Sequence, residues 1–285
     1  MTRSDLASRA TKFKALNDAG GLRLPNAWDA ASARIFQAAG FPAIGTTSAG
    51  IAYARGLLDA EVITRDDMMR EIAAIADAVD VPVTADVEAG YGPSPLDVAA
   101  TVEATLDAGA VGINLEDNAH AGAAADGSAP LFSIELQAAR IAAARAVADG
   151  RGIAMVINAR TDPFLMGLGA DDEERLAMSI ERGRAYLKAG ADLVFIPVLV
   201  DPAQVRRAAK EIGGPISLMA LPGAPSADTW FQAGAARVSL GPLAMMAALG
   251  VIRDIAAEFR DAGTWTSIER TFYGFAETKA LLARR

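Results

Sequence analysis

The sequence of 285 residues contains no cysteine and a single histidine. Without cysteine the chain has no disulfide framework, no thiolate metal site and no cysteine nucleophile. This composition is typical of a reducing compartment. A metal site in this chain would therefore be built almost entirely from oxygen ligands.

Positive charge is also scarce. Lys and Arg number 27 against 35 Asp and Glu, which gives a formal net charge of −8. Phosphate backbones and anionic lipid surfaces repel such a chain, so we expect neither nucleic acid nor a membrane as a partner. No apolar run approaches transmembrane length, and the first residues lack the apolar segment of a signal peptide. We expect a cytoplasmic protein.

The chain alternates short β-branched runs with longer amphipathic stretches. The runs lack strict apolar–polar alternation, as expected for strands that are buried on both faces. The eight runs are LRLPNA (22–27), AIGTTS (43–48), VPVTADV (81–87), VGINLED (111–117), IAMVINAR (153–160), DLVFIPVLV (192–200), PISLMAL (215–221) and ARVSL (236–240).

The stretches between the runs have the start and stop signals of helices. Thr64 and Ser94 precede helical patterns as N-caps, and Asp171 and Asp201 resemble the first residues of capping boxes. Four Ala-Gly pairs, beginning at 39, 108, 189 and 233, fit glycine as the left-handed residue that ends a helix.

Eight strand–helix units predict an α/β protein with a (β/α)₈ barrel of the TIM type. The alternative, an open doubly wound sheet, lacks the expected G-x-G-x-x-G after the first strand. We predict a single barrel domain over 1–285, with 264–285 as a C-terminal helical extension that forms one helix with a turn near Gly274. The extension carries four aromatic residues that a monomer would expose, so we expect it to pack on another subunit. The alternative is that it folds back on its own barrel.

Acidic residues follow the ends of successive predicted strands, where barrel enzymes carry their active sites. Asp86 and Glu88 end the third strand, Glu116 and Asp117 end the fourth, and Asp59 lies in the loop after the second. Several carboxylates buried at one mouth repel one another unless a cation neutralises them. Oxygen ligands favour Mg²⁺, or Mn²⁺ in its place. Each acid alone also fits a helix cap or a rim ion pair.

Three further features complete the predicted site. Arg160, at the end of the fifth strand, has the fork that binds a carboxylate, although it also fits an ion pair with one of the acids. The turn 46–50 offers hydroxyl and backbone N–H donors for a second carboxylate. His120 lies just beyond Glu116 in a loop of small residues that we predict to act as a lid, and it fits either an acid–base residue or an exposed loop histidine.

These residues resemble the isocitrate lyase/phosphoenolpyruvate mutase superfamily over about 22–260. The segments that carry the resemblance are LPNAWDAASARIFQAAGFPAIGTTSAG, VPVTADVEAGYG, VGINLEDN, INARTD and AGADLVFIP. Their combination in this order is more specific than any one motif.

The resemblance implies a Mg²⁺ site and a set of roles. It assigns the metal to Asp86, Glu88 and Glu116, with Asp59 holding water ligands, although the family usually has Asp at the position of Glu88. It assigns the substrate carboxylate to Arg160 and to the turn residues Thr47, Ser48 and Ala49. It also implies a homotetramer that exchanges C-terminal helices between subunits.

The departures from the family limit the reaction. The cysteine-bearing loop of the lyases is replaced by DNAHAGAAADGSAP, Gly45 stands at an aromatic position, and Pro197 stands at a glutamate position. The lid segment of the phosphonate-handling members is also missing. Isocitrate cleavage by the usual mechanism and mutase activity are therefore not expected.

What remains is an enzyme that stabilises an enolate. We predict a Mg²⁺-dependent lyase or hydrolase that cleaves a C–C bond of a small 2-oxo or 2-hydroxy (di)carboxylic acid. The alternatives are a phosphonopyruvate-type enzyme that acts on a C–P bond, a non-catalytic barrel that binds a 2-oxo acid, and an unrelated metal-dependent barrel aldolase.

Overall fold

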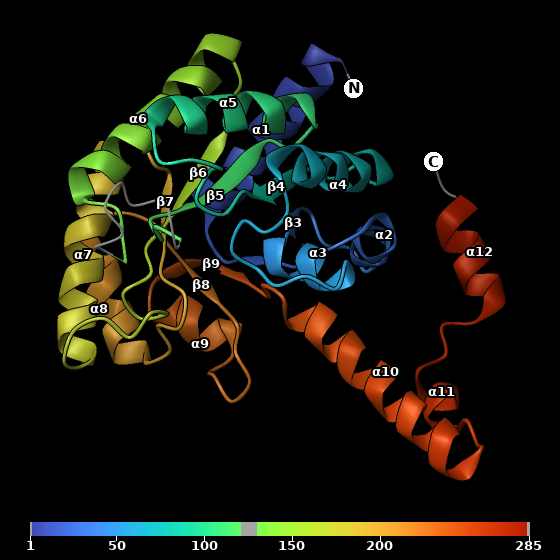
Figure 1. The fold of residues 1–285 in the computed structure, drawn as a ribbon. Helices are drawn as coiled ribbons and strands as arrows, with labels where there is room; N and C mark the ends of the chain where they lie inside the picture. Colours follow the sequence, from blue (N-terminus) through green and yellow to red (C-terminus); the bar gives the residue numbers. More distant parts are fainter. Residues whose placement is uncertain (1, 121–129, 284–285) are drawn as a thin grey trace.

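The computed structural model describes residues 2–120 and 130–283. Nine parallel strands form a ring in the order β1-β9-β8-β7-β6-β5-β4-β3-β2 (Figure 1). Their bounds are β1 (Leu22–Leu24), β2 (Asn26–Ala27), β3 (Ile44–Thr46), β4 (Val83–Asp86), β5 (Gly112–Glu116), β6 (Val156–Arg160), β7 (Leu193–Phe195), β8 (Ile216–Met219) and β9 (Ala235–Ser239).

The predicted TIM-type barrel is confirmed, with one difference in the first strand. The run 22–27 forms two short strands on either side of Pro25, which has no N–H to donate to a ladder. β1 pairs with β9 and β2 pairs with β3. The two halves of this run therefore pair with different neighbours, β9 on one side and β3 on the other, and together they close the ring.

Helices cover the outside of the ring and one of its ends. Phe13 of α1 is fully buried, and a Cβ on Gly112 of β5 would lie 2.8 Å from its ring, so α1 closes the amino end of the barrel. The helices are α1 (Arg3–Ala19), α2 (Ala30–Ala38), α3 (Ser48–Ala54), α4 (Arg65–Ala78), α5 (Pro95–Asp107), α6 (Ile134–Arg151), α7 (Asp172–Lys188), α8 (Pro202–Ile212), α9 (Ala227–Gln232), α10 (Leu243–Ala262), α11 (Thr266–Thr271) and α12 (Phe275–Ala283).

The predicted helix boundaries follow local chemistry. Ser94 and Asp97 form a complete capping box at the start of α5, and Thr64 caps α4 through the N–H of Asp67. Helix α5 ends at Asp107 with Ala108 as its C-cap, and the next residue, Gly109, has a φ of 92°. An L-residue with a side chain rarely adopts this conformation, so glycine stops the helix there.

The last three helices lie outside the ring. Figure 1 shows α10 projecting away from the barrel and α12 returning beside α2. The segment expected to be one helix with a turn near Gly274 is divided into α11 and α12. Trp265, Phe272, Tyr273 and Phe275 are all exposed. The division of the chain into a barrel and an extension at 264 stays a prediction.

None of the helices among the described residues is both long enough and apolar enough to cross a membrane. The cytoplasmic location expected from the sequence stays a prediction.

Candidate active site

The predicted site residues lie where the carboxyl ends of the strands meet. Asp86 ends β4, Glu116 ends β5 and Arg160 ends β6. Glu116 is directly paired with Arg160 in the register of β5 and β6. This mouth is the face on which barrel enzymes carry their active sites.

A pocket of about 150 Å³ opens at this mouth. Its volume suits a small acid, because pockets for drug-sized ligands measure roughly 300–1,000 Å³. Of the predicted residues, Glu88, Glu116 and His120 do not line it. The lining consists of Asn26, Thr47, Ser48, Ala49, Tyr53, Asp59, Asp86, Asn114, Arg160, Leu165, Phe195, Pro197, Met219, Ser239, Gly241 and Pro242.

Asp86 is held from the neighbouring strand. Ser48 donates to its Oδ2 from both the backbone N–H (3.1 Å) and the hydroxyl (2.8 Å). Thr46 accepts a hydrogen bond of 2.9 Å from the Asp86 N–H. The two bonds from Ser48 occupy Oδ2 of Asp86 and leave Oδ1 available to a ligand in the pocket. The turn 46–50 therefore positions an acid as well as lining the pocket.

Asp59 has an incompletely satisfied carboxylate. Its Oδ1 is buried, and the described part of the chain supplies no hydrogen-bond partner for it. Burial and then the charge of Asp86 raise the pKa of Asp59, while Arg160 opposes this shift. Two carboxylates thus lie close together with one buried oxygen unpaired, which a bound cation would relieve.

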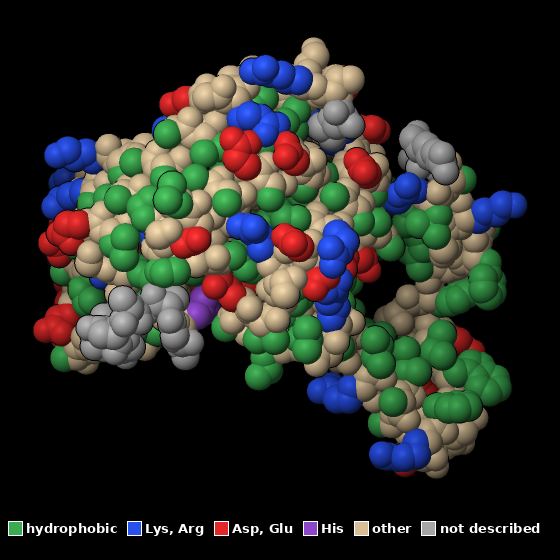
Figure 2. All heavy atoms as spheres, turned by 45° about the horizontal axis from the view of Figure 1, so that its top comes forward, with side chains coloured by type: hydrophobic (Ala, Val, Ile, Leu, Met, Phe, Trp, Pro, Cys, Tyr) green, Lys and Arg blue, Asp and Glu red, His purple; other side chains and the backbone are tan. Residues whose placement is uncertain are grey.

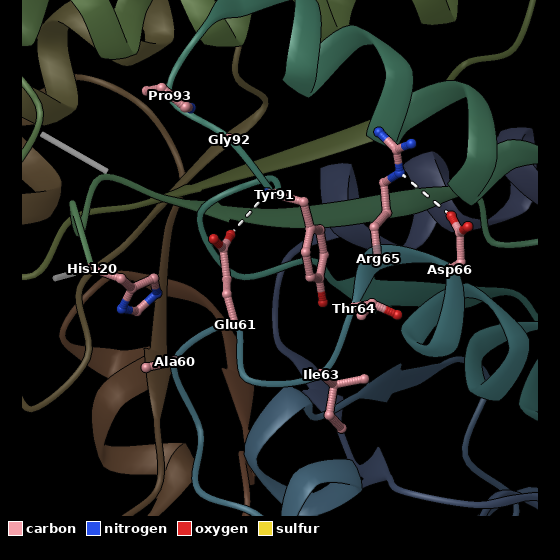
Figure 3. A pocket seen from close by; sticks show the side chains of 10 residues that line it. All are labelled: Ala60, Glu61, Ile63, Thr64, Arg65, Asp66, Tyr91, Gly92, Pro93 and His120. Atoms are coloured by element: carbon pink, nitrogen blue, oxygen red, sulfur yellow. Dashed lines mark hydrogen bonds and ion pairs between the residues drawn. The ribbon is translucent and has the colours of Figure 1, made fainter. Parts of the chain in front are cut away.

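Glu88 is turned away from the pocket, toward the loop that contains Glu61. It has a φ of 51°, is buried, and accepts hydrogen bonds from the Glu61 N–H and from the Tyr91 hydroxyl (3.4 Å). The Glu61 side chain in turn accepts from the Tyr91 N–H at 2.8 Å, as Figure 3 shows. Burial and then the charge of Asp59 raise the pKa of Glu88 to about 8. The extra methylene relative to aspartate thus lets Glu88 tie two loops together.

Glu116 is buried between Arg160 and His120. Arg160 Nη1 lies 2.5 Å from its Oε2, and His120 Nε2 lies 2.8 Å from its Oε1 without the alignment of a hydrogen bond. Burial raises the pKa of Glu116, although Arg160 and His120 each lower it. Burial alone would lower the pKa of His120, but its contact with Glu116 outweighs this and raises it.

His120 faces a second, wider pocket beside the first. This pocket measures about 730 Å³, and His120 and Glu61 line one part of it while Thr64 and Arg65 line another (Figure 3). The single histidine is also visible on the surface in Figure 2. It is therefore within reach of solvent. Most of the loop predicted to be a lid, 121–129, lies outside the described residues.

The guanidinium of Arg160 is engaged by protein carboxylates on more than one side. Nε and Nη2 donate to the two oxygens of Asp162 at 2.7 and 2.8 Å, in addition to the contact of Nη1 with Glu116. The ion pair kept open as an alternative for Arg160 is thus present. Each Nη nitrogen carries a second N–H, so the residue still presents donors to the pocket that it lines.

A buried network behind the mouth fixes Arg160 and Asp162. Asp117 is fully buried and accepts from the Asp162 N–H, from the hydroxyls of Thr161 and Tyr186 at 2.7 Å each, and from Arg182 at 3.1 Å. Because one carboxylate holds the residues that follow β6, it orients the strand end that carries Arg160. Its role is support from behind, not contact with the pocket.

The acids at the mouth do not form a ready-made metal cage. No group of three or more His, Asp or Glu side chains in residues 2–120 and 130–283 has the arrangement of a metal site. Glu88 and Glu116 are held by other protein groups, whereas Asp59 and Asp86 line the pocket. One or two carboxylates plus water ligands are a usual set for Mg²⁺. The pocket therefore fits a hydrated Mg²⁺ at Asp59 and Asp86.

The sequence analysis missed Asn114, a half-buried polar residue of the pocket lining. It lies two positions before Glu116 on β5 and therefore on the same face of the strand. That alternation was the signal that could have revealed it.

Comparison with known proteins gives one consistent family. The model of the phosphoenolpyruvate phosphomutase family matches residues 13–260. The 2-methylisocitrate lyase of Escherichia coli is 32% identical over 204 residues, which cover 71% of this chain and 66% of that enzyme.

Solved structures agree with this result. A Burkholderia cenocepacia protein provisionally described as a lyase or mutase superposes with a TM-score of 0.89 at 34% identity, covering 99% of this chain and 98% of that one. A phosphonopyruvate hydrolase in complex with oxalate and Mg²⁺ superposes with a TM-score of 0.82 at 26% identity, covering 96% and 95%.

Proposed function

The chain belongs to the phosphoenolpyruvate phosphomutase family, within the isocitrate lyase/phosphoenolpyruvate mutase superfamily, and on this premise we propose what it does. It is a Mg²⁺-dependent lyase or hydrolase that cleaves a C–C bond of a small 2-oxo or 2-hydroxy (di)carboxylic acid. The observation that carries the proposal is that Asp59, Asp86 and Arg160 line one pocket of about 150 Å³. Such a pocket joins ligands for a hard cation to an anchor for a carboxylate.

The metal site is proposed at Asp86, with Asp59 beside it and with Glu88 and Glu116 acting through water or after a change of rotamer. The buried, unpaired Oδ1 of Asp59 supports this assignment, because an adjacent cation would satisfy it. Mn²⁺ takes the same oxygen ligands and would serve in its place. When bound, the ion supplies an electrophile that polarises the carbonyl of a 2-oxo acid.

The remaining residues bind the substrate, stabilise the enolate and transfer a proton. Arg160 holds the substrate carboxylate together with Thr47, Ser48 and Ala49, which line the same pocket. As the bond between carbon three and the departing group breaks, its electron pair moves toward the carbonyl and leaves an enolate. The group departs as CO₂ from oxaloacetate, or as a phosphoryl group that passes to water from phosphonopyruvate, and a proton then returns to carbon three. The guanidinium of Arg160 stabilises that negative charge. We assign proton transfer to His120, which contacts Glu116 and faces the solvent-accessible pocket.

A C–P bond is the second candidate for cleavage. The likeness to phosphonopyruvate hydrolase over 96% of this chain favours it. Phosphonopyruvate and oxaloacetate both place a leaving group on carbon three of the same 2-oxo acid, so one pocket chemistry would serve either compound. The products distinguish them, because cleavage of phosphonopyruvate releases phosphate and cleavage of oxaloacetate does not.

The test is turnover with and without metal. Purified protein is incubated with oxaloacetate, 2-methylmalate or phosphonopyruvate in Mg²⁺ or in EDTA, and pyruvate, acetate, oxalate and phosphate are followed. We expect products only with Mg²⁺, and a loss of at least about 100-fold in Asp86→Asn and Arg160→Gln, because each variant removes a charge from the reacting centre. Glu181→Gln, an exposed acid on α7, is the matched control. Binding without any product would favour the non-catalytic alternative.

We also propose that the protein is a homotetramer that exchanges its C-terminal helices. Helix α10 follows the last strand but buries only Met245. An apolar cavity of about 320 Å³ beside β1 and β9 is lined by Leu24, Pro25, Trp230 and Val238 among others. Figure 2 shows apolar side chains exposed along the arm that contains α10–α12. A second copy of the chain has helices of this character to cover such a surface.

A further inference from the structure

A layer of polar side chains lies inside the barrel, beneath the pocket. Its members stand two positions before residues at the mouth and therefore point to the same side of their strands. Asn114 precedes Glu116, Asn158 precedes Arg160, and Arg237 precedes Ser239. Barrel interiors are usually filled by branched apolar side chains, so this layer is unusual for the fold.

Arg237 is the member of the layer whose burial destabilises the fold most. Its side chain is 1% exposed, and no carboxylate in the described ranges lies within ion-pair distance of it. Its neighbours are neutral oxygens: Asn114 Oδ1 at 3.0 Å, Asn17 Oδ1 at 3.4 Å and Ser217 Oγ at 3.4 Å. Burial lowers the pKa of Arg237 to about 9. A buried cation without a counter-ion destabilises a fold, so a role in the pocket above would explain its presence.

The chemistry of the guanidinium fixes the orientation of Asn114. Arginine has five N–H donors and no acceptor, so the Asn114 atom that faces it must be the oxygen. The amide of Asn158 donates to the same Oδ1 at 2.8 Å. A flipped Asn114 would place N–H groups against both donors. Two independent donors therefore hold the Asn114 oxygen in the polar layer.

The other end of the Asn114 amide is then left for the pocket. Asn114 is half-buried and lines the pocket with Asp86 and Arg160. Its Nδ2 donates to no acceptor in the part of the chain that the structure describes. A fixed donor that is only partly exposed and has no protein partner is the kind of group that recognises a ligand oxygen.

We propose that Asn114 is a substrate-binding residue whose amide N–H donates to an oxygen of the bound acid, and that Arg237 and Asn158 are the positioning residues that aim it. This inference rests on the proposed function and extends it to substrate choice. A fixed N–H group donates to the oxo or hydroxyl oxygen on carbon two of the ligand. It disfavours an ammonium group at that carbon, which has only donors to offer. The site therefore selects 2-oxo and 2-hydroxy acids over 2-amino acids.

Binding of pyruvate and of alanine, which differ only at carbon two, tests the selection. Dissociation constants are measured by calorimetry in Mg²⁺, and Mg²⁺ affinity is measured separately. We expect wild type to prefer pyruvate. Asn114→Ala should weaken pyruvate binding about 3- to 10-fold, the range for a hydrogen bond between neutral groups, and leave Mg²⁺ affinity within about twofold. Asn114→Asp, whose carboxylate accepts from an ammonium group, reduces or reverses the preference for pyruvate over alanine.

A double-mutant cycle tests the positioning role of Arg237. Arg237→Met should weaken pyruvate binding by a factor similar to that of Asn114→Ala. The double variant should bind pyruvate no more weakly than Asn114→Ala alone, because both changes remove the same interaction. Thr84→Val is the matched control, since Thr84 is buried in the same layer but its hydroxyl has no hydrogen-bond partner in residues 2–120 and 130–283. Asn158→Ala serves as the second positioning variant where Arg237→Met does not fold.

The outcomes separate the two proposals. If wild type binds none of the acids in Mg²⁺, the proposed function fails, and this inference fails with it. If wild type binds pyruvate but Asn114→Ala binds it equally well, or Thr84→Val weakens it as much, only the assignment to Asn114 is overturned. If the effects of Arg237→Met and Asn114→Ala simply multiply, Arg237 does not act through Asn114.

Discussion

At the scale of single residues, alternation along the strands and reach of the side chains determine the pocket. The predicted residues at strand ends, Asp86 and Arg160, line the pocket because a parallel barrel brings strand ends together. The direction of Glu88 could not be predicted, because it depends on a left-handed backbone and on an N–H donor in a distant loop. Asn114 and Arg237 were predictable in principle, since polar residues in strands that should be wholly apolar call for a partner or a role.

Glu88→Asp tests the link between the two loops at the mouth. The shorter side chain cannot reach the Glu61 N–H, so we expect the segment 57–63 to open more often. Loss of a hydrogen bond to a charged group should increase its amide exchange by about 10- to 100-fold. Hydrogen exchange of peptides that cover this loop measures the effect. Glu71→Asp, which shortens a partly exposed acid paired with Arg55, is the control, and unchanged exchange in the loop would refute the link.

Tyr186→Phe tests the support behind Arg160. The change removes one of the donors to the buried carboxylate of Asp117 without altering the ring. We expect the free energy of unfolding to fall by about 1–2 kcal/mol, the usual effect of losing one such bond. Urea unfolding at a fixed protein concentration measures it. Tyr273→Phe removes an exposed hydroxyl and should have no effect, and equal stability of the two variants would contradict the assigned role.

At the scale of helices and strands, local chemistry predicted more than packing did. The caps at Thr64 and Ser94 and the Ala-Gly stops were read from the sequence, because each depends on a few adjacent residues. The turn near Gly274, which has a φ of 56°, was also expected from the sequence, because glycine favours such a conformation. The ring closure at Pro25 was not predicted, because it depends on which strands lie on either side of one proline. A periodic pattern does not reveal such contacts between distant segments.

Glu258 gives a pH-dependent prediction for this region. It accepts from the Thr264 hydroxyl and from the N–H groups of Thr266 and Ser267, so it fastens the start of α11 to α10. The bonds from Ser267 and then Thr264 lower the pKa of Glu258 to about 2. Because the folded pKa lies below the ordinary value of 4.5, the stabilisation is complete above pH 4.5 and disappears as the pH falls toward 2.

Pepsin cleavage near Trp265 between pH 4.5 and 2 measures this loss. We expect wild type to become more sensitive as the pH falls, relative to sites in the barrel. Glu258→Gln should already be sensitive at pH 4.5 and should change little on further acidification. Glu269→Gln, an exposed acid on α11, should behave as wild type. A wild-type cleavage rate that does not change with pH relative to the barrel would contradict the role of Glu258.

At the scale of the whole molecule, the projecting arm supports the proposed assembly. Ile252 and Phe259 of α10 and Phe275 of α12 are each at least 60% exposed in a single chain. Exposed apolar surface of this extent is typical of an interface. The aromatic content of the tail led to the same expectation, which stays a proposal, and the direction in which α10 leaves the barrel could not be predicted from the sequence.

Phe259→Lys tests the assembly. A charge on an exposed position of α10 should leave the barrel folded and lower the molar mass in solution toward 29.5 kDa, the mass of one chain. Light scattering coupled to size-exclusion chromatography measures the mass, and circular dichroism checks the fold. Leu96→Lys, an 80% exposed position on α5, is the control. A wild-type mass of one chain would contradict the proposed tetramer.

We propose that the pocket at the carboxyl end of the barrel uses Mg²⁺ to bind and cleave a small 2-oxo acid. The decisive measurement is calorimetric titration of the wild-type protein with oxaloacetate and phosphonopyruvate, in Mg²⁺ and then in EDTA, with product release followed in parallel. We expect binding and product release in Mg²⁺ and neither in EDTA. Equal binding in Mg²⁺ and EDTA, or no binding in either, would contradict it.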